Sequence, residues 1–72
     1  MSVSSSSAKE IANLGGSLEI TEKAGFSSSS VKDLVRIVAT KGGTIRIHAQ
    51  GYSSSALKEF VKIGKGSVTV II

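Results

Sequence analysis

The sequence contains no cysteine, no proline and no tryptophan, and it has a single histidine. Without cysteine, neither a disulfide framework nor a thiolate metal site can hold the fold. One histidine, His48, excludes a metal site built from several histidine ligands. No apolar run approaches the roughly 20 residues that a membrane-spanning helix needs, and the first residues, MSVSSSSAKE, lack the features of a secretory signal. We therefore expect a soluble, cytoplasmic chain that uses no metal or cofactor and binds no membrane.

Acidic and aromatic residues are also scarce. Nine Lys and Arg against five Asp and Glu give a net charge of +4, which would permit contact with nucleic acid. However, the basic residues are interspersed with acidic ones, and no run of five or more charges of one sign occurs. Phe26, Tyr52 and Phe60 are the only aromatic residues, too few to indicate a platform for base stacking. Nucleic acid is therefore the alternative partner, not the first one.

What the sequence does contain is threefold self-similarity, with units at about 3–25, 26–51 and 52–72. Each unit has a serine tract, a lysine followed by an acidic residue, then glycine and an alternating apolar segment. The lysine–acid pairs are Lys9–Glu10, Lys32–Asp33 and Lys58–Glu59. The apolar pairs are Leu18 and Ile20, Ile45 and Ile47, and Val68 and Val70. The 72 residues are therefore predicted to form one domain of three repeats.

The first half of each unit has the pattern of an amphipathic helix. In the second unit, Val31, Leu34, Val35 and Val38 recur at spacings of three and four, which gives one apolar stripe. The expected N-caps are Ser4, Ser27 and Ser53, each preceded by an apolar residue in the register of a hydrophobic staple. The glycines expected to end the helices in left-handed conformation are Gly15, Gly16, Gly42, Gly43, Gly64 and Gly66.

The second half of each unit alternates apolar and polar residues, which predicts a half-buried strand. The order helix–strand, three times over, predicts an α/β fold with a three-stranded parallel sheet and all helices on one face, because helical crossovers join parallel neighbours. If the strands lie in chain order, the open face carries two rows of side chains. These rows are Glu19, Arg46 and Thr69, and then Thr21, His48 and Ile71.

Two features of this fold would lack a cover, namely the pair of free edges at the first and third strands and the open sheet face. The third strand, VTVII, is apolar, β-branched and free of proline, so its edge would be a template for pairing with another molecule. The expected self-association residues are Val68, Val70, Ile71 and Ile72 on the strand, and Arg46 and His48 on the face. Head-to-tail stacking would bury the third strand's edge against the first strand of a neighbour and would give a ring or a filament. Antiparallel pairing of two third strands would give a twofold dimer, and face-to-face packing of two open sheet faces is the third possibility.

We therefore expect a non-enzymatic structural or interaction module that forms homo-oligomers. The helix starts offer an alternative, a basic module that binds anions or nucleic acid with free N–H groups, serines and lysines. The residues of this alternative are Ser27, Ser28, Ser53, Ser54, Lys32 and Lys58. Their spacing does not match a phosphate-binding loop. No catalytic residue is predicted, because the serines cluster at helix starts, away from His48 on the sheet face.

Overall fold

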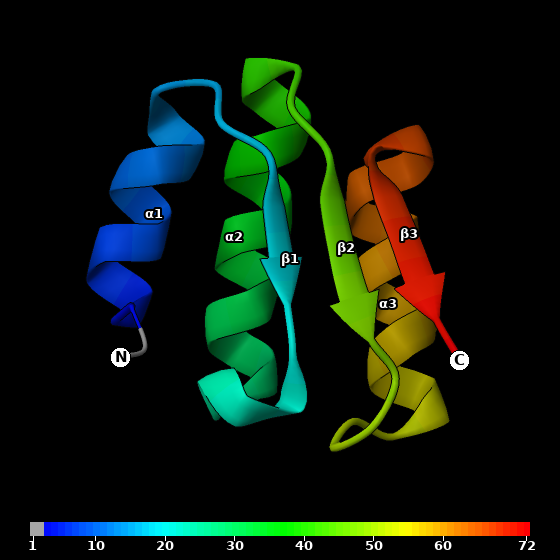
Figure 1. Cartoon of the computed structure of the whole chain (residues 1–72). Coiled ribbons are helices and arrows are strands. Elements are labelled where there is room, and N and C mark those ends of the chain that lie inside the picture. The colour runs from blue at the N-terminus through cyan, green and yellow to red at the C-terminus, as the bar shows by residue number, and fades with distance from the viewer. Residues whose placement is uncertain (1–2) are drawn as a thin grey trace.

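A computed structural model describes residues 3–72, in which three α-helices and three parallel strands alternate along the chain (Figure 1). The helices are α1 (Ser5–Asn13), α2 (Ser28–Lys41) and α3 (Ser54–Gly64). The strands are β1 (Leu18–Ile20), β2 (Ile45–His48) and β3 (Val68–Ile71), and two short 3-10 helices, η1 (Glu22–Ala24) and η2 (Lys65–Ser67), complete the structure. The expected alternation of helices and strands is confirmed.

The strands form one parallel sheet in the order β1-β2-β3, with the helices on one face (Figure 1). Glu19 lies beside Arg46, and Arg46 lies beside Thr69, as the sequence predicts for the open face. In the next row His48 lies beside Ile71, whereas Thr21 falls just after the end of β1. None of the helices within residues 3–72 is long and apolar enough to cross a membrane.

Serine side chains begin all three α-helices, at the predicted positions. The hydroxyl oxygens of Ser4, Ser27 and Ser53 accept hydrogen bonds from the backbone N–H three residues later, at 3.2, 3.3 and 3.1 Å. Each bond satisfies one of the N–H groups that the first turn leaves without an intrahelical partner. The serine tracts are therefore parts of helices rather than linkers.

The glycine prediction is confirmed for one glycine of each pair after α1 and α2, and it is wrong for Gly16, for Gly43 and for both glycines after α3. Gly15 and Gly42 have positive φ, at +88° and +80°. After α3 the positive φ belongs to Lys65, at 51°, while Gly64 has a φ of −90°. Gly64 is required for space instead, because a Cβ there would overlap the side chain of Val68 and lie 2.7 Å from Val35 Cγ1.

The core lies between the sheet and the helices. The predicted stripe of α2 is buried along its length, and Ile45 and Ile47 of the central strand are fully buried against the helices. Helix α3 contributes Phe60, while α1 contributes only the small side chains Ala8 and Ala12. The first helix is therefore the least well covered part of the core.

Candidate functional site

The outer edge of β3 exposes hydrogen-bonding backbone groups. Ala49 N–H donates to Ile71 O over 2.9 Å, so the peptide groups of Ile71 point toward β2. Because peptide groups alternate in direction along a strand, those of Val68 and Val70 point to the other side. No strand within residues 3–72 pairs with β3 on that side. The predicted edge residues therefore do present free donors and acceptors, from Val68 and Val70.

The side chains of β3 divide between the core and the surface. Val68 packs against the core, Val70 and Ile71 are half-buried, and Ile72 is fully exposed. Ile71 and Ile72 line a shallow hollow of about 400 Å³ together with His48. The predicted edge and face residues thus meet at one corner of the sheet.

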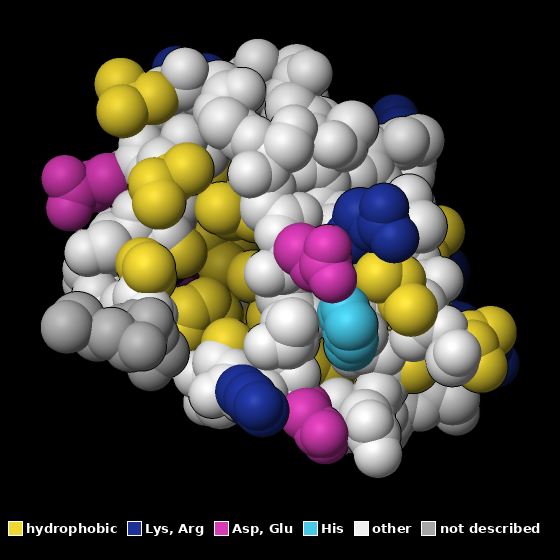
Figure 2. All heavy atoms as spheres, viewed as in Figure 1, with side chains coloured by type: hydrophobic (Ala, Val, Ile, Leu, Met, Phe, Trp, Pro, Cys, Tyr) yellow, Lys and Arg dark blue, Asp and Glu magenta, His cyan; other side chains and the backbone are white. Residues whose placement is uncertain are grey.

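Arg46 and His48 on the open face converge on Glu19. His48 Nε2 lies 2.7 Å from Glu19 Oε2, and Arg46 Nε lies 3.9 Å from Glu19 Oε1. Figure 2 shows acidic, basic and histidine side chains side by side on this face. Packing two such faces together would remove this charged cluster from water at a considerable cost. The cluster therefore makes the open face a poorer docking surface than the strand edge.

The partner of His48 was not predicted from the sequence, in which His48 falls in a row with Thr21 and Ile71. The contact could have been predicted from the strand register. A long side chain also reaches its diagonal neighbour, two residues away on the adjacent strand. His48 pairs diagonally with Glu19 of β1, and Arg46 lies directly opposite the same carboxylate. The His48 side chain is therefore engaged in a contact within the chain, with Glu19.

These ion pairs predict that acid destabilises the protein. The pKa of Glu19 lies below its ordinary value of 4.5, chiefly because of the hydrogen bond with His48 and then because of the Arg46 charge. Lys32 likewise lowers the pKa of Glu59 below 4.5. A lowered pKa in the folded state stabilises the fold above the unfolded pKa, and this contribution is lost as the pH falls through the folded value. We therefore expect the free energy of unfolding to decrease as the pH is lowered beyond about 4.5.

Urea unfolding measured from about pH 7 to about pH 3 checks this expectation. Glu19→Gln should show a shallower loss of stability in acid than the parent chain. Glu22→Gln, at a carboxylate with no ion pair among residues 3–72, is the matched control and should retain the parent dependence. Equal acid dependence of Glu19→Gln and the parent chain would contradict the role assigned to Glu19.

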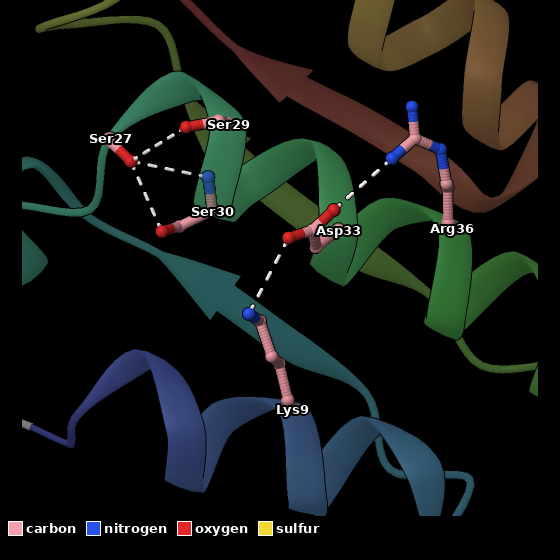
Figure 3. Close-up of polar contacts among 6 residues, drawn as sticks. All are labelled: Lys9, Ser27, Ser29, Ser30, Asp33 and Arg36. Carbon is pink, nitrogen blue, oxygen red and sulfur yellow. Dashed lines mark hydrogen bonds and ion pairs between the residues drawn. The ribbon is translucent and has the colours of Figure 1, made fainter.

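Two of the four predicted anion-binding serines, Ser27 and Ser53, are engaged with their own helices as N-caps. Ser27 Oγ accepts from Ser30 N–H at 3.3 Å and lies 3.3 Å from Ser29 Oγ (Figure 3). Ser53 Oγ accepts from Ala56 N–H, and Ser28 and Ser54 are exposed in the first turns. The hollow between the turns at Gly25 and Gly51 has Glu22 in its lining, and the negative charge of this residue would disfavour an anion. The arrangement therefore favours helix capping over anion binding.

Lysines connect neighbouring helices in a regular way. Lys9 Nζ of α1 lies 3.5 Å from Asp33 Oδ2 of α2 (Figure 3), and Lys32 Nζ of α2 lies 2.7 Å from Glu59 Oε2 of α3. Asp33 also pairs with Arg36 one turn later, at 3.2 Å. The first two helices thus each direct a lysine to the acidic residue of the helix that follows. Lys32 is consequently less free to bind an anion than its sequence position suggests.

An apolar groove between α1 and the outer edge of β1 was not predicted. It has a volume of about 640 Å³, and its apolar lining includes Val3, Ile11, Leu18 and Phe26. Figure 2 shows hydrophobic side chains gathered in this hollow. The element order contained the signal, because α2 and α3 each connect two strands of the sheet, whereas α1 precedes the first described strand. The groove is the place where one more strand would lie.

The described part of the chain, residues 3–72, contains no group of three or more His, Cys, Asp or Glu residues that could hold a metal ion. No protein-family model matches the chain, and comparisons with curated proteins and with solved structures find no match either.

Proposed function

We propose that this chain is a cytoplasmic, non-enzymatic structural module that self-associates through the free edge of β3. The observation that carries the proposal is the outward direction of the Val68 and Val70 peptide groups on a strand with no outer neighbour among residues 3–72. Natural proteins protect such edges with proline, charge or a covering element, because an open edge pairs readily with another strand. The side chains of β3 include neither proline nor a charge.

The other surfaces give less support to a function. The open face is occupied by the Glu19 cluster, which is better left in water. For nucleic-acid binding, Lys32, one of the two lysines of that alternative, already pairs with Glu59. Arg36 on the same helix already pairs with Asp33. The outer edge of β3 instead presents backbone donors and acceptors that have no strand partner within residues 3–72.

Light scattering over a wide concentration range, applied to the parent chain and to Val70→Pro, tests the proposal. The parent chain should form species larger than its 7.4 kDa monomer. Proline at position 70 removes an outward N–H and leaves the β2–β3 hydrogen bonds in place, so edge pairing should be lost while the circular dichroism of the helices is retained. Val70→Ala keeps the N–H group and is the matched control, which should assemble.

Two results would overturn the proposal. A parent chain that stays monomeric at every concentration would show that the module does not self-associate. A Val70→Pro variant that assembles like the parent chain would show that association does not use the outer edge of β3.

A further inference from the structure

We infer that the binding partner of the β3 edge is the groove between α1 and β1 of a second copy of this chain. This inference rests on the proposed self-association and adds the site that receives the strand. β3 of one copy would lie beside β1 of the next in parallel, so that the sheet and the helix layer both continue from copy to copy. Four independent features of the structure support this head-to-tail arrangement.

The first feature is the exposure of Ile11 at the groove. Ile11 aligns in the threefold sequence pattern with Leu34 of α2 and Phe60 of α3, which are both fully buried. Ile11 is 40% exposed and lines the groove. No strand precedes α1 within residues 3–72, so this position has no cover on one side. β3 of a second copy would supply that cover.

The second feature lies at the opposite end of the helix layer. Val61 of α3 is 42% exposed, while the aligned residues Ala12 of α1 and Val35 of α2 are fully buried. α1 packs against α2, and α2 packs against α3. Ala12 and Val35 therefore each have a following helix to cover them, whereas Val61 has none within residues 3–72. In the head-to-tail arrangement, α1 of the second copy would cover Val61 in the same way.

The third feature is the direction of the backbone groups on the two free edges. Leu18 N–H donates to Thr44 O over 3.0 Å, so the peptide groups of Leu18 point toward β2 and those of Glu19 point to the free edge. On β3 the outward groups belong to Val68 and Val70. Pairing Val68 with Leu18 of the second copy repeats the register Leu18–Ile45–Val68 found inside the sheet. In this register Val70 N–H would donate to Glu19 O of the second copy.

The fourth feature is charge. Within the chain, Lys9 pairs with Asp33 and Lys32 pairs with Glu59, each lysine contacting the acidic residue of the next helix. Lys58 and Glu10 are the remaining members of this series, and neither makes an ion pair within residues 3–72. A head-to-tail contact brings Lys58 of one copy to Glu10 of the next. Antiparallel pairing of two β3 strands would not bring these residues together.

Because the two contacting surfaces differ, each added copy leaves one β3 edge and one groove free. The assembly therefore grows to a filament or closes into a ring, depending on the rotation between copies. A twofold dimer would instead stop at two chains and leave both grooves empty. The mass distribution of the parent chain thus already separates the two arrangements, and charge reversal separates them further.

The decisive experiment compares Glu10→Lys, Lys58→Glu and their 1:1 mixture by light scattering at low ionic strength. Alone, each variant places like charges at every head-to-tail contact, and we expect association about three- to tenfold weaker than for the parent chain.

In the mixture, copies of the two variants can alternate. One contact then joins the native Lys58 to the native Glu10, and the next joins the two introduced residues, which also have opposite charges. Association should therefore return to the parent level. High salt should reduce these differences, because both native residues lie on the solvent-facing side of their helices.

A mixture of Glu10→Lys with Lys41→Glu is the matched control. It balances the net charge in the same way but leaves Lys58 opposite the lysine introduced at position 10 in half of the possible contacts, so association should not be fully restored. If the parent chain assembles and the charge variants behave like it, alone and mixed, the head-to-tail inference is wrong and the proposed self-association stands. If the parent chain does not assemble at all, the proposed function itself fails.

Discussion

Replacing Phe60 with alanine is expected to lower the free energy of unfolding by about 3–5 kcal/mol. The Phe60 ring is fully buried, and its centroid lies 5.5 Å from that of Tyr52 in an edge-to-face arrangement. Tyr52 in turn donates from its hydroxyl to Phe26 O at 2.9 Å, which connects the starts of α2 and α3. The substitution therefore leaves a cavity beneath the sheet and removes an aromatic contact that orients this connection.

The loss is large for a domain of this size. Proteins typically have about 0.05–0.15 kcal/mol of stability per residue, so a chain of 72 residues is expected to have a total of about 4–11 kcal/mol. Urea unfolding at a concentration where the parent chain is monomeric would measure the change. Val61→Ala, on the same helix but 42% exposed, is the control and should cost much less. A loss below about 1 kcal/mol for Phe60→Ala would contradict the position of this ring in the core.

The features that the sequence predicted correctly depend on local patterns. The spacing of Val31, Leu34, Val35 and Val38 determines which face of α2 is buried, whatever the helix packs against. Similarly, a serine N-cap is satisfied by a backbone N–H only three residues away, so Ser27 and its equivalents were recognisable without knowledge of the tertiary structure. The parallel sheet then follows from the alternation of helices and strands.

The features that the sequence analysis missed depend on contacts between distant segments. Glu19 and His48 are 29 residues apart, and their contact requires both the strand order and the diagonal reach of the histidine side chain. The exposure of Ile11 was missed for a different reason, because its sequence pattern matches that of the buried Leu34. What differs is the number of strands around the helix. The groove is therefore a property of the topology rather than of the α1 sequence.

The turn between α3 and β3 shows why residue type alone did not identify the role of a glycine. Gly64 and Gly66 were both expected to adopt a left-handed conformation, yet Lys65 between them has the positive φ. Gly64 adopts an ordinary helical conformation. Its lack of a side chain instead permits the close approach of Val68 and Val35. A glycine can thus satisfy either a conformational or a spatial requirement, and only the packing distinguishes the two.

Gly64→Ala is therefore expected to destabilise the protein by about 1–3 kcal/mol, although alanine is the better helix former. The new Cβ would overlap the side chain of Val68 and lie 2.7 Å from Val35 Cγ1. Neither valine can turn away easily, because β-branched side chains have few χ1 rotamers and Val35 is fully buried. The backbone between α3 and β3 would have to shift, and β3 would shift with it.

Thermal and urea unfolding of Gly64→Ala beside Gly66→Ala tests this spatial role. A Cβ at Gly66 would meet nothing within 4 Å, so its replacement should leave stability close to that of the parent chain. If the two variants unfold alike, Gly64 is not a packing position. If Gly64→Ala alone is destabilised, the close contact of α3 with β3 is confirmed. Because that contact fixes the strand that carries Val68 and Val70, the same variant should also weaken self-association, which makes Gly64 a connection between the core and the proposed docking edge.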